Sequence, residues 1–217
     1  MPPDNQLLIR LSTGSLRYSE LPDWLPLHNF STALEAFFAC AFVNPDLTGR
    51  EHGCCIISRD NYLLLPRQHK VQGDERQVTP TCEPNNTSPE HIETYVGYVH
   101  THVCKTTEDL PHPGFSGQDF CKSIDDGLNL SVVCNGQDIF MLARSSDRTM
   151  QRVDSKILGN WMFIFRRHLS RLGKKPNDEL LSLSIWEANR LMCDLTGYTL
   201  YFGPRGTDRL KCVYRPQ

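Results

Sequence analysis

The stretch from Tyr95 to Phe120 constrains the chain most, because it combines an H-x-H pair with an S-x-x-D pattern in a short span. Its first part, Tyr95 to Val103, is rich in valine, tyrosine and threonine, which favours a β-strand. Side chains of a strand alternate between its two faces, so His100 and His102 are expected to project on the same side. Two imidazoles on one face can bind one ion, and the pattern therefore predicts a metal site.

Asp119 is the best candidate for a third ligand of this site. A hydrolytic zinc uses three protein ligands and a water molecule, and a carboxylate in the first turn of a helix is kept ionised by nearby amides. A helix is expected from Ser116, after a connector that Pro111 and Pro113 keep irregular. However, Ser116 and Asp119 also fit a helix capping box without a metal, and histidines on a strand are often structural. The residues alone leave both interpretations open.

A carboxylate for proton transfer is expected at Glu51. An activated water needs a carboxylate that takes its proton and passes it to the leaving group. Glu51 begins an apolar strand, where a carboxylate lies either at the rim of the sheet or buried for a purpose. The competing glutamates occur in polar, loop-like sequence, and they are Glu83, Glu90, Glu93 and Glu108.

Other catalytic patterns are weaker. The sequence contains no H-E-x-x-H, G-x-S-x-G or P-loop, and it lacks the P-C-x-x-C of nucleobase deaminases. Cys104 lies two residues after His102, so a cysteine nucleophile paired with histidine is a further option. His112 falls in the connector and is open to assignment as a loop residue, a substrate contact or a substitute ligand.

The rest of the chain alternates between strand and helix patterns. Leu34, Phe37, Phe38 and Ala41 recur at helical spacing, so a buried helix capped by Ser31 is expected before Pro45. A polar connection follows over 67–93, with room for one more strand around Val78. The other expected elements are a hairpin turning at Asp60-Asn61, a second hairpin of LSVVC and DIFMLA turning at Asn135-Gly136, helices from about Asp154 to Leu172 and from Asp178 to about Leu195, and strands at YTLYF and LKCVY.

Composition excludes several classes of protein. The 23 basic and 25 acidic residues give a net charge of −2, with no basic run of the kind that binds nucleic acid or anionic membranes. The nine cysteines are odd in number and form no C-x-x-C, which argues against a zinc ribbon, a thioredoxin-type pair and a fully paired disulfide framework. We expect no membrane span and no signal peptide, and a reducing compartment is the simpler location.

The order of Glu51, His100-Thr101-His102 and Ser116-x-x-Asp119 resembles the JAB/MPN superfamily of JAMM zinc metallopeptidases. More narrowly, EHG before a hairpin, GYVHTH and FSGQD are similar to JAB-like domains of uncharacterised function in bacterial polymorphic toxins and effectors. The resemblance covers roughly Ser31 to Arg144. It implies an α/β (α+β) fold with a mixed, curved β-sheet flanked by helices. We therefore expect an N-terminal segment over 1–30, a JAB/MPN-like core over 31–150 and a C-terminal helical extension over 151–217 packed on the core.

The resemblance also implies a role for each site residue. His100, His102 and Asp119 would bind Zn²⁺ together with a water, Glu51 would be the general base and acid, and Ser116 would stabilise the oxyanion. The reaction would be hydrolysis of a peptide or isopeptide bond. The alternative is a catalytically inactive module of the same fold that binds a partner protein, such as a secretion-system component or adaptor. A hydrolase for another type of bond is a third option.

Two features depart from the family pattern. Thirteen residues separate His102 from Ser116, which makes a longer connector than usual, and Val103 replaces the proline that often follows the second histidine. An insertion beside the metal could select or cover a substrate, and it could equally mean that the geometry of the active site has drifted. The expected partners are a protein or peptide substrate and a secretion-system or immunity protein, and the expected location is the cytoplasm, or outside the cell as an effector without a classical signal peptide.

Overall fold

The computed structural model describes residues 5–43, 50–67, 70–73, 78, 94–102, 114–149, 151–154, 156–157, 160, 167 and 178–217. The helices are α1 (Asn5–Ser12), α2 (Asn29–Val43), α3 (Gly117–Asp125) and α5 (Asp178–Thr196), with a 3-10 turn at Tyr18–Glu20. The strands are β1 (Trp24–Pro26), β2 (His52–Arg59), β3 (Tyr62–Leu64), β4 (Val71–Gln72), β5 (Thr94–Thr101), β6 (Leu130–Cys134), β7 (Asp138–Ala143), β8 (Thr199–Pro204) and β9 (Arg209–Tyr214).

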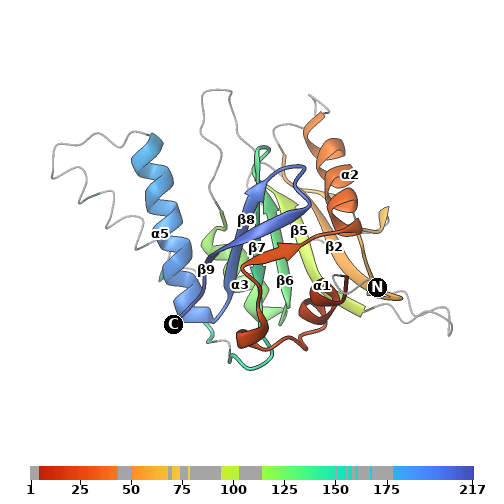
Figure 1. Cartoon of the computed structure of the whole chain (residues 1–217). Coiled ribbons are helices and arrows are strands. Elements are labelled where there is room, and N and C mark those ends of the chain that lie inside the picture. The colour runs from red at the N-terminus through yellow and green to blue at the C-terminus, as the bar shows by residue number, and fades with distance from the viewer. Residues whose placement is uncertain are drawn as a thin grey trace.

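The strands form one curved, mixed sheet shaped like half of a barrel, with helices on both faces (Figure 1). Their order is β1-β9-β8-β7-β6-β5-β2-β3, and β4 pairs with β2 beside β3. Strands β5 and β6 are parallel, whereas the other paired strands in the described part of the chain are antiparallel. The expected α+β class with a mixed, curved sheet flanked by helices is confirmed.

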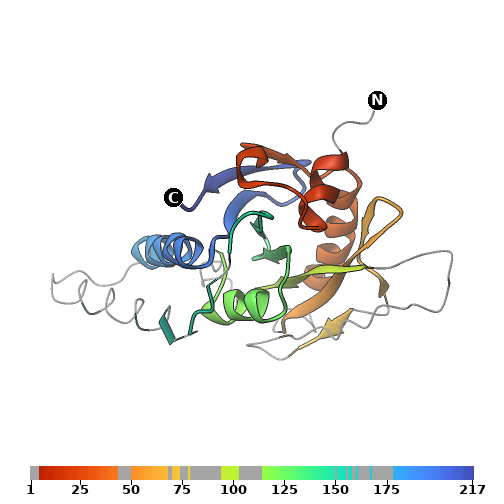
Figure 2. The ribbon, with the colours of Figure 1, turned by 90° about the horizontal axis from the view of Figure 1, so that it is seen from below.

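Two apolar layers hold the helices on the sheet, because both faces of the central strands are apolar. In β6, Leu130 and Val132 face the layer that includes α1 and α2, whereas Val133 joins Phe140 of β7 in the layer that includes α3 and α5. Figure 2 shows the two helix groups on opposite sides of the sheet. Full burial of such a side chain contributes roughly 1.5–3 kcal/mol. The site-bearing helix α3 is thus fixed to the sheet by packing.

The helix expected before Pro45 is present as α2, and Leu34 and Phe38 are fully buried as its spacing predicted. Its expected cap is wrong. The helix begins at Asn29, so Ser31 lies inside the first turn, and the Ser31 hydroxyl donates to the carbonyl of His28 at 2.6 Å. The Ser31 side chain is therefore a hydrogen-bond donor to the backbone inside the helix, and it is not the cap of the helix N-terminus.

Both expected hairpins are confirmed. Asp60 and Asn61 have φ values of 51° and 63°, the left-handed backbone that a tight two-residue turn between antiparallel strands requires. In the second hairpin, the Asn135 side-chain oxygen accepts from the N–H groups of Gln137 and Asp138 at 3.1 and 2.8 Å. These bonds stabilise the turn between β6 and β7.

The sheet continues across both boundaries expected at residues 30 and 150. Strands β8 and β9 match the expected YTLYF and LKCVY strands, and they extend the sheet from β7, after which β1 pairs with β9. The second C-terminal helix is confirmed as α5. The chain beyond residue 150 is therefore not only helical, because it supplies two strands to the sheet that carries the histidines. Within the described residues, no helix combines the length and apolar character needed to span a membrane.

Two expected elements fall mainly on residues outside the described ranges. Most of the helix expected from Asp154 to Leu172 lies there, as do the neighbours of Val78, which is itself buried and not part of a strand. The connection expected over 67–93 contains the short strand β4. Strand β4 was not predictable from the sequence, since two residues are too short to show an alternating pattern.

The close approach of β5 to β6 requires glycine at position 97. A Cβ atom there would lie 2.1 Å from the carbonyl oxygen of Leu130, so Gly97→Ala must push the two strands apart. We expect a loss of about 3 kcal/mol in the free energy of unfolding, measured by urea denaturation. Gly127→Ala is the control, because Gly127 has a φ of +63° but no heavy atom within 4 Å of the added Cβ. The Gly127→Ala variant should lose only the free energy of backbone strain, about 1 kcal/mol. Equal losses of stability in the two variants would contradict the steric explanation.

Candidate metal centre

Two histidines stand at the carboxyl end of β5, close to where the sequence places them. His100 is inside the strand, whereas His102 follows its last residue, Thr101, because the strand covers Thr94–Thr101 and not Tyr95 to Val103. The N–H of His102 donates to the carbonyl of Cys134 at 2.9 Å, which continues the pairing with β6 beyond the strand. Both rings are buried, with exposed fractions of 2% and 8%.

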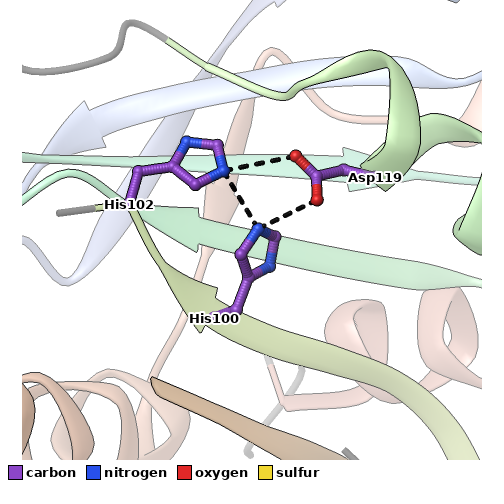
Figure 3. A group of neighbouring side chains, drawn as sticks. All are labelled: His100, His102 and Asp119. Carbon is purple, nitrogen blue, oxygen red and sulfur yellow. Dashed lines mark hydrogen bonds and ion pairs between the residues drawn. The ribbon is translucent and has the colours of Figure 1, made fainter. Parts of the chain in front are cut away.

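Asp119 meets both imidazoles (Figure 3). The Nε2 atom of His100 lies 3.1 Å from Asp119 Oδ1, and the Nε2 atom of His102 lies 3.3 Å from Asp119 Oδ2. The two Nε2 atoms are 3.1 Å apart. Three potential ligand atoms from two elements therefore converge on one point, and this group could hold a metal ion.

The dimensions of the cluster suit a small tetrahedral cation. Ligand atoms at about 2.0–2.1 Å from a tetrahedral Zn²⁺ lie about 3.3 Å from one another. The separations of 3.1, 3.1 and 3.3 Å join four atoms, since His100 faces Oδ1 and His102 faces Oδ2, and each separation is close to one edge of such a tetrahedron. Two imidazole nitrogens and one carboxylate oxygen are also a donor set found in catalytic zinc sites, which leave the fourth corner open.

Ser116 both begins helix α3 and orients Asp119. The N–H of Asp119 donates to Ser116 Oγ at 3.3 Å, and the N–H of Ser116 donates to Asp119 Oδ2 at 2.7 Å. This reciprocal pair is the capping box that the sequence offered as an explanation without a metal. The Asp119 side chain therefore takes part in the capping box and also faces both histidines. Because the Ser116 N–H already bonds to Oδ2, Oδ1 is the oxygen better placed to bind a cation.

The charges of the cluster stabilise each other. Burial alone would raise the pKa of Asp119, but the charge and hydrogen bond of His100, followed by those of His102, hold it well below its usual range. Burial opposes protonation of His102, but the hydrogen bond and charge of Asp119, with smaller contributions from Glu51 and the Gly114 backbone, raise its pKa. Asp119 is thus ionised at neutral pH.

Tyr98 supports the cluster from the same strand. Its ring stacks on His100 with ring centroids 5.2 Å apart, and its hydroxyl donates to the backbone carbonyl of Asp119 at 3.2 Å. Burial, followed by the charge of Asp119, raises the pKa of Tyr98 well above its usual value, so the phenol remains a donor. Tyr98 was not among the predicted site residues, although its place two residues before His100 indicates that both side chains share a face.

Glu51 lies beside the cluster. Gly53 pairs with His100 in the register of β2 against β5, and the same register continued by two residues brings Glu51 opposite His102. Paired residues of antiparallel strands share a face, and the charge of Glu51 contributes to the raised pKa of His102. The hydroxyl of Thr101, on the opposite face, accepts from the N–H of His52 at 2.9 Å and so fixes the backbone next to Glu51.

The remaining candidates are not tested by the structure. Cys104 and His112 lie outside the described residues, as does most of the connector between His102 and Ser116. The competing glutamates Glu83, Glu90, Glu93 and Glu108 also lie outside them.

Three cysteines of the central strands, Cys54, Cys55 and Cys134, are not available as nucleophiles. Cys55 is disulfide-bonded, whereas the thiols of Cys54 and Cys134 are free and buried. Burial raises the pKa of each of these two thiols to about 12, so both remain protonated and unreactive at neutral pH.

Comparison with known proteins adds nothing to this geometry, since no protein-family model and no curated protein matches the chain.

The cluster should bind about one zinc ion per chain, because two imidazoles and one carboxylate bring ligand atoms within 4.8 Å of one another. Elemental mass spectrometry of protein purified without added chelator measures this stoichiometry. His102→Ala and Asp119→Asn should each lose the ion, since either change removes one of the three ligands. Asp126→Asn is the matched control in the same region, because Asp126 pairs with Lys122 at the far end of α3. Retention of zinc in both ligand variants would exclude the cluster as the binding site.

Zinc affinity should fall as the pH is lowered. The raised pKa of His102 means that a proton competes for its Nε2 atom already above the usual value of about 6.5. Below that pKa, loss of one ligand to a proton weakens binding about tenfold per pH unit. Titration against a chromophoric chelator measures the profile. Glu51→Gln removes a charge that raises this pKa, so the decline should begin at a lower pH, and an unshifted profile would contradict the placement of Glu51.

Proposed function

We propose that the chain is a zinc-dependent peptidase or isopeptidase that hydrolyses an amide bond. The observation that carries the proposal is the grouping of His100, His102 and Asp119, whose potential ligand atoms lie within 4.8 Å of one another and near a further carboxylate. The order of these residues, which resembles that of the JAMM metallopeptidases, supports the choice of an amide bond. A peptide or protein is then the substrate.

Glu51 is the proton carrier in this proposal. When bound, a zinc ion with three protein ligands activates a water molecule and polarises a carbonyl group. Glu51 immediately precedes β2 and its charge acts on His102, and its carboxylate accepts the proton that the attacking water loses. As the new C–O bond forms and the C–N bond breaks, Glu51 passes that proton to the leaving amine. It therefore starts and ends the cycle ionised.

Ser116 supplies a donor at the other side of the cluster. Its Oγ atom accepts from the N–H of Asp119 in the capping box, which leaves the hydroxyl proton as the group to donate. A hydroxyl fixed at a helix N-terminus is suited to bind the oxygen that becomes negative during amide hydrolysis. One residue thus orients a ligand through its backbone and serves the reaction through its side chain.

The setting of this activity follows the family resemblance. JAB-like domains of bacterial toxins and effectors suggest delivery to a target cell, with a secretion-system or immunity protein as partner. The cytoplasm, or a location outside the cell reached without a classical signal peptide, suits both settings.

Glu51→Gln should abolish cleavage and keep the zinc, because the amide retains the shape of the carboxylate but cannot accept the proton. A panel of fluorogenic peptides with α-amide bonds and with lysine ε-amide bonds measures the activity. We expect kcat/KM on the best probe to fall about 10²- to 10⁴-fold.

Glu187→Gln is the matched control, since Glu187 lies on the surface of α5 in an exposed pair with Arg190. It should change neither cleavage nor zinc content. Zinc binding without cleavage of any probe by the wild-type chain would overturn the enzymatic proposal and favour the inactive, partner-binding module.

A further inference from the structure

Asn189 of helix α5 binds the backbone that leads into the site. Its side-chain oxygen accepts from the N–H of Phe115 at 2.8 Å, and its NH₂ group donates to the carbonyl of Phe115 at 2.9 Å. The second proton of the same NH₂ group is donated to Ile185, one turn earlier in α5, at 3.0 Å. Asn189 is fully buried, so its amide holds both polar groups of a residue that is 74 positions away.

Gly114 is fitted to this amide. Its φ of +125° is accessible to glycine and strained for other residues, and a Cβ atom at this position would lie 2.7 Å from the Asn189 oxygen. The backbone of Gly114 also interacts with His102. The segment Gly114–Ser116 is therefore held by Asn189 on one side and faces the metal cluster on the other.

The contact between Asn189 and Phe115 is linked to Asp119 through Ser116. Phe115 precedes Ser116, whose N–H donates to Asp119 Oδ2. A shift of Phe115 would move the Ser116 N–H and change the direction of the carboxylate relative to His100 and His102. Ligand-orienting groups of this kind commonly change metal affinity by a factor of about 10 to 100 when they are removed.

We propose that Asn189 is a positioning residue of the metal centre, because its amide fixes Phe115 from both sides and thereby aligns Ser116 and Asp119 with the two histidines. The inference rests on the proposed metal-dependent function. It assigns to the C-terminal helix a part in the site that the resemblance to JAB/MPN proteins, which ends near Arg144, does not include.

Packing alone does not explain this arrangement. Phe115, Phe120, Ala188 and Met192 already join α3 and α5 in one apolar cluster, which holds the helices together without fixing the direction of any backbone group. A buried asparagine adds three directional bonds at the cost of desolvating an amide. A segment that carries a metal ligand needs such bonds, because they fix the orientation of its backbone.

The test compares zinc affinity in Asn189→Ala with that in Met192→Ala. Met192 is a buried neighbour on the same helix, and its truncation disturbs packing but leaves the amide contacts in place. Affinity is measured by competition with a chromophoric chelator, and circular dichroism in the absence of zinc checks the fold. Asn189→Ala should weaken zinc binding about 10- to 100-fold, whereas Met192→Ala should reduce thermal stability and change affinity less than about threefold.

Two further variants test whether the hydrogen bonds of Asn189 are the cause of the change in zinc affinity. Asn189→Leu keeps a similar volume and a good helix former but removes the hydrogen bonds, so it should weaken binding as Asn189→Ala does. Gly114→Ala should weaken binding in the wild-type background and have a smaller effect in Asn189→Ala, where the atom that the new Cβ meets is gone.

Each outcome decides the inference. Unchanged zinc affinity in a folded Asn189 variant would overturn it and leave the metal-dependent function standing. Unfolding of both Asn189→Ala and Asn189→Leu would assign Asn189 to fold stability and also overturn it. A wild-type chain that binds no zinc would overturn the proposed function and this inference together.

Discussion

The crossover from β5 to the parallel strand β6 decides where the ligands meet. A parallel pair cannot be closed by a tight turn, so the chain must return across the sheet, and α3 makes this return. A helix that runs back in this way begins near the carboxyl end of the first strand. The N-terminal turn of α3, which carries Asp119, is thereby brought to the end of β5, which carries His100 and His102. Gly97 allows the pairing, because β6 passes too close to β5 at that point for any side chain.

A cation resolves a problem that the fold creates. Two Nε2 atoms that face each other at 3.1 Å can share only one proton, and Asp119 lies within 3.3 Å of both. In a buried place, each nitrogen or oxygen atom that lacks a partner costs free energy. A divalent ion at the shared point satisfies all three ligand atoms at once, whereas a single proton does not. The arrangement is thus compatible with metal binding.

Local patterns in the sequence predicted those parts of the site that local geometry determines. The alternation in a strand places His100 and His102 on one side, and the four-residue capping box places Ser116 against Asp119. The hairpin turns were predictable for the same reason. The sequence contains no comparable signal for Asn189. Its side chain contacts the backbone of Phe115, which is 74 positions away, and a backbone group leaves no mark on the residue type. The pairing of β1 with β9 was also not predictable, since β1 has only three residues and no alternating pattern of its own.

The continuity of the sheet bears on which part of the chain forms one structural unit with the histidine cluster. Strand β8 covers the edge of β7, and α5 covers Phe140 and Leu142 on its face. Without the residues after 150, that edge would present unpaired backbone groups and that face would be exposed to water. The same residues supply the amide of Asn189 to the segment before α3. The resemblance noted in the sequence ends near Arg144, but the sheet that carries His100 extends to β8, β9 and β1, and α5 packs on it.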